Sequence, residues 1–304
     1  MANLKSIKSK IISYKKTGTV THAMEAVSAV KMRKSQERAL GGRAYSAAAL
    51  SVLERLSGTA DLAKHPLMQP AAGKTCFIVV VSDKGLAGSL NSGVIRRVEE
   101  DMRTRNLKKE DVCIIGIGRR GAEHFANRGF EVLLKKENLS DAASESSILE
   151  VTNLVLELHA AGKIGTAVVA YQNFISTFEQ QPVTRQVVPI TQDLIKEMIA
   201  GIRPAKGKYA PQSDEAVRPS AYTIEPDADT VLSILLPRLL NIAVFYAVLE
   251  AKASEHSARM VAMKSATDKA KEMAHNLTRT FNKVRQAAIT REVSEITSGI
   301  EAMR

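Results

Sequence analysis

The last quarter of this 304-residue chain carries a helical repeat that nothing interrupts. From Leu239 to Ala288, fifteen positions recur alternately three and four residues apart, all of them apolar except His256 and Thr267, which is the spacing of a helix that packs along a narrow seam. No proline follows Pro237, and no glycine lies between Leu239 and Gly299. A helix of about 60 residues would be about 90 Å long, far beyond the usual globular helix. The pattern therefore predicts a rod that must pair with another helix. The seam positions are Leu239, Ile242, Tyr246, Leu249, Ala253, His256, Met260, Met263, Thr267, Ala270, Ala274, Leu277, Phe281, Val284 and Ala288.

The N-terminal segment repeats this pattern less regularly. Residues 1–65 contain no proline, and Leu4, Ile7, Ile11 and Tyr14 form one seam. Val20, Met24, Val27 and Val30 form a second seam, offset from the first. Thr17-Gly18-Thr19 lies between the two and predicts a shift in register. We expect the terminal helices to pair as an antiparallel coiled coil.

Strand and helix patterns alternate in the middle of the chain, which is typical of a mostly parallel sheet covered by helices. We therefore expect an α/β domain over residues 66–230, ending in an irregular connector at 203–230, between an N-terminal helix within 1–65 and a C-terminal helix within 231–304. The expected strands are 76–82, 112–117, 130–134, 166–174 and 186–190, and the expected helices are 90–105, 120–128 and 146–159.

Composition and charge narrow the function classes. Two cysteines, Cys76 and Cys113, sit in apolar runs, so buried thiols are favoured over a secreted disulfide framework, with a redox pair as the alternative. The apolar stretch 231–251 is interrupted by Pro237, Arg238 and Asn241, which favours a buried helix over a membrane span.

Residues 1–60 carry a net charge of +8 and residues 238–304 a net charge of +4, whereas residues 61–237 carry a net charge of −1. Basic ends suit an anionic partner of some kind, whether nucleic acid, membrane or protein.

Two glycine turns are the candidates for ligand chemistry. Gly116, Gly118 and Gly121 spell G-x-G-x-x-G between a strand and a helix, as in a dinucleotide site, but a suitably placed acidic residue about 20 positions on is lacking. A tight packing turn is the simpler interpretation.

The loop from Asp83 to Ser89 lacks the Lys-Ser/Thr ending of a phosphate-binding loop, and we expect it to present Asp83 and Lys84 to a partner. The histidines show no metal-ligand spacing, and His256 is expected to pack in the seam. A dinucleotide-binding enzyme and a basic coiled-coil nucleic-acid binder stay open as alternatives.

Five stretches closely resemble the γ subunits of F-type ATP synthases. They occur in the family's order, and the likeness runs from about residue 3 to residue 300. The stretches are Thr21–Arg38 (THAMEAVSAVKMRKSQER), Val81–Asn91 (VSDKGLAGSLN), Tyr222–Asp227 (YTIEPD), Ala253–Asp268 (ASEHSARMVAMKSATD) and Phe281–Gly299 (FNKVRQAAITREVSEITSG).

The resemblance implies a fold and a role. The fold is an antiparallel coiled coil of the N- and C-terminal helices with a Rossmann-like α/β domain between them. The role is the central rotor shaft, which couples proton-driven rotation of the c ring to conformational changes in the catalytic β subunits. It implies no active site, cofactor or metal in this chain, with ATP, ADP and Mg²⁺ bound on the α and β subunits. The implied partners are α, β, ε, the c ring and, within the complex, δ, with no nucleic acid. Without a clear transit peptide, the implied place is the cytoplasmic face of a bacterial inner membrane rather than a mitochondrion, reached only through the complex.

The resemblance also implies contact residues. By match to the family pattern, Arg285 and Gln286 would hydrogen-bond β subunits, and Thr290, Glu292 and Glu295 would follow on the same helix. Met24, Lys84 and Arg259 would face the α/β ring as well, the first and last near an acidic β loop. Tyr222 and Glu225 would lie against the c ring and ε.

Overall fold

The computed structural model describes residues 4–41, 65–69, 71–191 and 227–303. They form two compact units, one from residues 1–29 with 259–304 and one from residues 30–258. Two helices, α1 (Leu4–Gly41) and α7 (Ala228–Ala302), run through both units. The other elements are η2 (Pro66–Met68), β1 (Lys74–Val80), α3 (Leu90–Thr104), η3 (Lys109–Asp111), β2 (Val112–Ile117), α4 (Arg119–Asn127), β3 (Glu131–Lys136), η4 (Glu145–Ile148), α5 (Leu149–Ala160), β4 (Ile164–Phe174) and β5 (Gln180–Val188).

The five strands form one mixed sheet in the order β3-β2-β1-β4-β5. Strands β3, β2, β1 and β4 are parallel, and β5 runs antiparallel to β4 at the edge. This confirms the predicted fold class. The predicted last strand is wrong at its start, because β5 begins at Gln180 rather than near Gln186. Pro182 lies inside β5, and an edge strand tolerates a proline because its missing N–H only removes one donor from the ladder.

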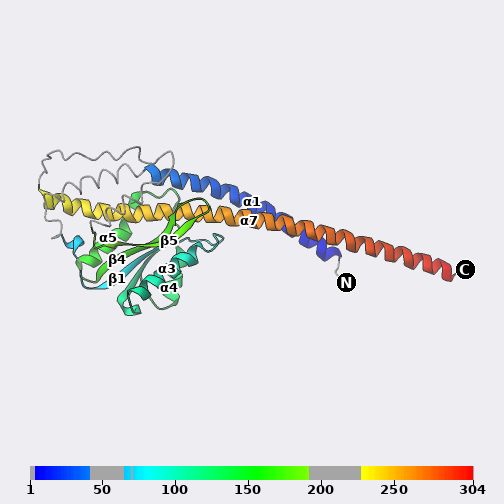
Figure 1. The fold of residues 1–304 in the computed structure, drawn as a ribbon, viewed down its shortest axis with the longest axis horizontal. Helices are drawn as coiled ribbons and strands as arrows, with labels where there is room; N and C mark the ends of the chain where they lie inside the picture. Colours follow the sequence, from blue (N-terminus) through cyan, green and yellow to red (C-terminus); the bar gives the residue numbers. More distant parts are fainter. Residues whose placement is uncertain (1–3, 42–64, 70, 192–226, 304) are drawn as a thin grey trace. The chain divides into compact units, whose positions relative to one another are not determined.

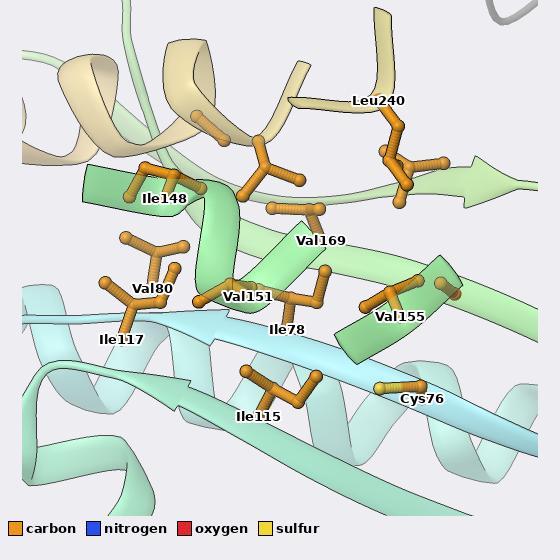
Figure 2. Close-up of a cluster of buried hydrophobic side chains, with 14 of the residues drawn as sticks. Cys76, Ile78, Val80, Ile115, Ile117, Ile148, Val151, Val155, Val169 and Leu240 are labelled. Atoms are coloured by element: carbon orange, nitrogen blue, oxygen red, sulfur yellow. The ribbon is translucent and has the colours of Figure 1, made fainter. Parts of the chain in front are cut away.

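Apolar side chains cover both faces of this sheet, because alternate residues of a strand point in opposite directions. On one face, Ile78 and Val80 of β1 pack with Val151 and Val155 of α5 and with Leu240 of α7 (Figure 2). On the other face, Phe77 and Val79 pack under α3 and α4. The α/β unit therefore has three layers, with α3 and α4 on one side of the sheet and α5 with the first half of α7 on the other (Figure 1).

The first half of α7 is a core helix. One window of α7 is long and apolar enough to cross a membrane by length and composition alone, yet half of it is buried inside the protein. Leu232, Leu236, Leu240, Val244 and Val248 are each almost fully buried. Pro237 lies inside the helix without ending it. The expected buried helix is confirmed.

The two terminal helices pair antiparallel in the other unit. The hydroxyls of Thr21 and Thr267 lie 2.6 Å apart, and a Cβ built on Gly18 would lie 3.6 Å from that of Ala270. Continuing this register places Ile11 opposite Leu277 and Ile7 opposite Phe281. Every predicted seam residue of α7 from Leu239 to Ala288 is buried or half-buried, so the predicted heptad is confirmed.

The predicted second seam of α1 is wrong. Val20, Val27 and Val30 are 58%, 56% and 56% exposed. The first seam instead continues without a shift through Gly18, Thr21, Glu25, Ser28, Met32 and Ser35, each half-buried or buried. Small polar residues fill it because their hydroxyls are paired: Thr21 donates to the carbonyl of Thr17 at 3.0 Å and Ser28 to that of Met24 at 2.7 Å.

Candidate functional site

The place where an α/β sheet usually binds a ligand is filled in this chain. Such sites lie beyond the carboxyl ends of the strands where the strand order reverses, here between β1 and β4. Helix α7 covers that edge, and the Ser254 hydroxyl donates to the carbonyl of Gln172 at the end of β4, 3.0 Å away. Val80 and Ser82 on β1 and in the loop after it, with Val248 and Lys252 on α7, line a cavity of about 10 Å³ that remains there. A space of that size holds about one water molecule, so a dinucleotide does not fit.

The G-x-G-x-x-G turn is a packing device. A Cβ on Gly118, whose φ is +96°, would lie 1.9 Å from the carbonyl oxygen of Val81, and one on Gly116 would lie 2.6 Å from the Cβ of Ala122. The glycines thus let α4 lie close against β1 and β2. The amide groups that would bind a phosphate are already used: that of Gly118 donates to Lys136 O at 2.8 Å and that of Arg119 to Asp83 Oδ1 at 2.9 Å. These contacts favour the simpler interpretation of the motif.

The loop after β1 points one of its two predicted side chains inward. Asp83 caps α4 through Arg119 and also accepts from the amide of Asn138 at 3.0 Å. Lys84 is exposed. Next to it, Leu86 is 62% exposed with a φ of +65°, so the loop holds an apolar side chain at the surface in a backbone conformation that L residues rarely adopt. Of the two predicted residues, Lys84 has the geometry of a contact residue and Asp83 that of a structural one.

The five predicted contact residues near the C-terminus lie together on the exposed end of α7. Arg285, Gln286, Thr290, Glu292 and Glu295 are all exposed. Thr290 donates to the carbonyl of Gln286 at 3.0 Å, and Arg291 pairs with Glu295 at 2.7 Å. Pairs exposed to this degree contribute little to stability. These side chains are thus available for contact outside the chain.

An apolar stripe on the same end of α7 was missed from the sequence. Beyond Ala288 every described residue is exposed, and the apolar ones again recur three and four residues apart. An exposed apolar stripe of this kind marks an interaction surface. The three-and-four spacing beyond Ala288 is the sequence signal for this stripe. The stripe consists of Ile289, Val293, Ile296, Ile300 and Met303, which are 52–84% exposed.

The remaining predicted contact residues are spread along the chain. Met24 and Arg259 are half-buried, on α1 and α7 respectively. Tyr222 and Glu225 lie outside the described residues, as does the connector up to residue 226.

Cys76 and Cys113 are free, buried and directly paired in register on β1 and β2. Burial as small apolar side chains is confirmed. Within the described ranges, no cluster of three or more His, Cys, Asp or Glu side chains could hold a metal ion.

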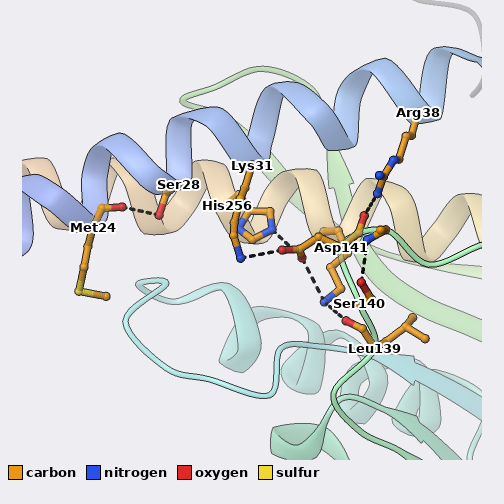
Figure 3. A network of polar contacts seen from close by, with 10 residues as sticks. Met24, Ser28, Lys31, Arg38, Leu139, Ser140, Asp141 and His256 are labelled. Carbon is orange, nitrogen blue, oxygen red and sulfur yellow. Dashed lines mark hydrogen bonds and ion pairs between the residues drawn. The ribbon is translucent and has the colours of Figure 1, made fainter.

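A polar centre around Asp141, in the loop after β3, was also missed (Figure 3). Its carboxylate accepts from Lys31 of α1 at 2.8 Å and from His256 of α7 at 2.9 Å, with Lys252 3.6 Å away. Partial burial opposes the charge, but the hydrogen bonds from Lys31 and His256 and the nearby positive charges outweigh it and hold the pKa of Asp141 well below its usual range. His256 thus does more than pack in the seam. No sequence pattern links Asp141 to residues more than 100 positions away.

Comparison with known proteins agrees with this architecture. The family model described as ATP synthase matches residues 3–303. The ATP synthase gamma chain of Pelotomaculum thermopropionicum is 34% identical over 304 residues, and that of Cupriavidus necator 37% over 304 residues, with both chains covered in full in each case.

Solved structures share the fold. The central stalk and c-ring structure of the Tetrahymena thermophila mitochondrial ATP synthase contains a chain with a TM-score of 0.60 at 22% identity, covering 81% of this chain and 99% of that one. A chain of the Euglena gracilis mitochondrial ATP synthase rotor gives a TM-score of 0.61 at 18% identity, covering 94% and 98%. The full-length sequence matches decide the family, and the structures agree with it in fold: this chain belongs to the ATP synthase gamma chain family.

Proposed function

We propose that this chain turns as the central shaft of an F-type ATP synthase and passes rotation between a c ring and the catalytic subunits. As a member of the gamma chain family, it is a non-catalytic subunit of the F1 sector. ATP, ADP and Mg²⁺ bind to the α and β subunits in this proposal, and the chain itself contributes no catalytic group.

The observation that carries the proposal is the exposed C-terminal end of α7, residues 289–302. The seam partner α1 begins at Leu4, and in the register of the coiled coil Leu4 lies opposite Val284. Helix α7 continues to Ala302 with an apolar stripe that no described residue of this chain covers. A single helix with an exposed apolar stripe is unfavourable in water unless something encloses it. A ring of α and β subunits around the tip would do so, with Arg285, Gln286, Thr290, Glu292 and Glu295 as the polar contacts.

The net charges of +8 over residues 1–60 and +4 over residues 238–304 support contact with acidic surfaces of the partner subunits. Met24 and Arg259 are proposed to lie near an acidic loop of the β subunits, and Lys84 is proposed to face the α/β ring. Tyr222 and Glu225 are proposed to meet the c ring and the ε subunit, with δ a further member of the complex. Bacterial relatives of full length support a place on the cytoplasmic face of the inner membrane, reached through the complex.

Co-expression with α and β subunits from the same source tests the proposal. We expect a complex of three α, three β and one copy of this chain by native mass spectrometry, with ATPase activity. Replacing the stripe residues Val293 and Ile296 with Glu should weaken assembly about tenfold or more, because two buried apolar contacts become buried charges. The control Leu149→Glu places one glutamate on an exposed residue of α5, outside the stripe, and should assemble normally. Normal assembly of the stripe variant would contradict the enclosed tip.

The polar contacts have a separate test. In the assembled complex, Arg285→Ala with Gln286→Ala should lower ATP hydrolysis about tenfold, since hydrogen bonds to a charged group are lost. Failure of the unchanged chain to join α and β, together with stoichiometric binding of a nicotinamide nucleotide or of DNA, would contradict the rotor and favour one of the two alternatives.

A further inference from the structure

One turn of α7 is buried on every side. Ser254, Glu255, His256 and Ser257 are consecutive, and each is at most 9% exposed. Consecutive side chains of a helix point about 100° apart, so four of them sample the whole circumference. At this turn the helix is therefore enclosed, although it is built from polar residues.

Two serines of this turn bind the sheet. Ser254 donates to the carbonyl of Gln172 on β4 at 3.0 Å, and Ser257 donates to the carbonyl of Thr177, in the turn between β4 and β5, at 2.6 Å. Gln180, the first residue of β5, adds a bond to the Ser257 hydroxyl at 3.5 Å. Both serine hydroxyls thus leave their own helix and reach backbone carbonyls of the β4–β5 hairpin.

On the opposite side of the turn, side chains of α7 bind the loop that follows β3. His256 donates to the Asp141 carboxylate at 2.9 Å, and Lys252, one turn earlier, donates to the carbonyl of Leu139 at 2.8 Å. The same loop reaches α1, because Lys31 pairs with the Asp141 carboxylate and Arg38 donates to the Asp141 carbonyl (Figure 3). We call the turn 254–257 together with Asp141, Gln172 and Thr177 the collar.

The chemistry of the collar differs from the apolar packing that holds α7 against the sheet just before it, at Leu240, Val244 and Val248. Apolar packing is non-directional, so it fixes the rotation and register of a helix less sharply than hydrogen bonds do. Hydrogen bonds depend steeply on distance and angle, and buried ones are costly to leave unmade. Buried polar groups at a helix seam also fix register. Polar bonds from Ser254 and Ser257 on one side and from His256 on the other therefore resist both rotation of α7 about its axis and sliding along it.

We propose that the collar is the grip through which turning force passes between the α/β sheet and helix α7, with Asp141 a positioning residue that secures α1 at the same level. This inference rests on the proposed function, since a grip matters only in a chain that transmits torque. Both α1 and α7 pass through the level of the collar as unbroken helices.

Proton pumping in the complete synthase tests the grip. Inverted membrane vesicles carrying Ser254→Ala with Ser257→Ala should hydrolyse ATP within about twofold of the unchanged enzyme but pump about threefold fewer protons per ATP, because two hydrogen bonds that resist slip are lost. Asp141→Asn should act in the same direction. The control Ser233→Ala removes a hydroxyl of α7 that donates only to Thr230 within its own helix, and should pump normally.

Conservative variants separate grip from folding. Ser254→Thr keeps the hydroxyl and His256→Gln keeps a donor toward Asp141, so both should pump normally where Ser254→Ala and His256→Leu pump fewer protons per ATP. If the double serine variant does not assemble, the single variants should show a smaller loss in the same direction. Collar variants that assemble, hydrolyse and pump like the unchanged enzyme would overturn the grip and leave the proposed function intact. Failure of the unchanged chain to assemble would contradict the proposed function and the grip with it.

Discussion

Gly118 shows why the G-x-G-x-x-G motif occurs in this chain without a dinucleotide site: the glycine is needed for packing. Gly118→Ala should destabilise the α/β unit by more than about 3 kcal/mol, because the new methyl group would overlap the Val81 carbonyl and α4 would have to move. Gly129, just after α4, is the matched control: its φ is +78°, but nothing lies within 4 Å of an added Cβ. Gly129→Ala should therefore cost only the strain of the backbone, about 1–2 kcal/mol. Denaturant unfolding of both variants checks this, and equal costs would contradict the packing account.

At the scale of the element, the coiled-coil seam contains a polar pair, Thr21 and Thr267, among mainly apolar contacts. Thr21 and Thr267 face each other, and Thr267 also donates to the carbonyl of Met263 at 2.8 Å. Replacing either threonine with valine should cost about 1 kcal/mol, because it leaves a hydroxyl facing a methyl group. Replacing both should cost less than the sum of the single changes, since two methyl groups then meet and no hydroxyl faces an apolar group. Thermal unfolding of the three variants measures the coupling, and strict additivity would argue against a direct contact.

The C-terminal end of α7, residues 289–302, is exposed and is expected to contribute little to the stability of the isolated chain. Deleting residues 289–304 should shift the thermal midpoint of the isolated chain by less than about 2 °C, since every described residue there is exposed. The same deletion should abolish assembly with α and β subunits. A large loss of stability in the isolated chain would show that this end is held by the chain itself.

At the scale of the whole molecule, long periodic features were predictable and long-range polar contacts were not. The α7 heptad and strand β2 follow from local spacing, and both appear as predicted. The offset seam of α1 failed because small polar residues such as Ser28 can fill a seam when the backbone pairs their hydroxyls. Asp141 could not be found, because its partners Lys31 and His256 lie 110 and 115 positions away and no local rule joins them.

The central claim concerns motion of the whole molecule, so the most direct measurement is rotation. Both natural cysteines are buried, so Lys108→Cys, in the exposed turn before η3, gives a single reactive thiol for a bead. With the α and β subunits fixed to a surface, the account predicts that added ATP turns the bead steadily in one direction, with three pauses in each revolution, one for each β subunit. A complex that hydrolyses ATP at the normal rate while the bead only fluctuates about one angle would contradict it.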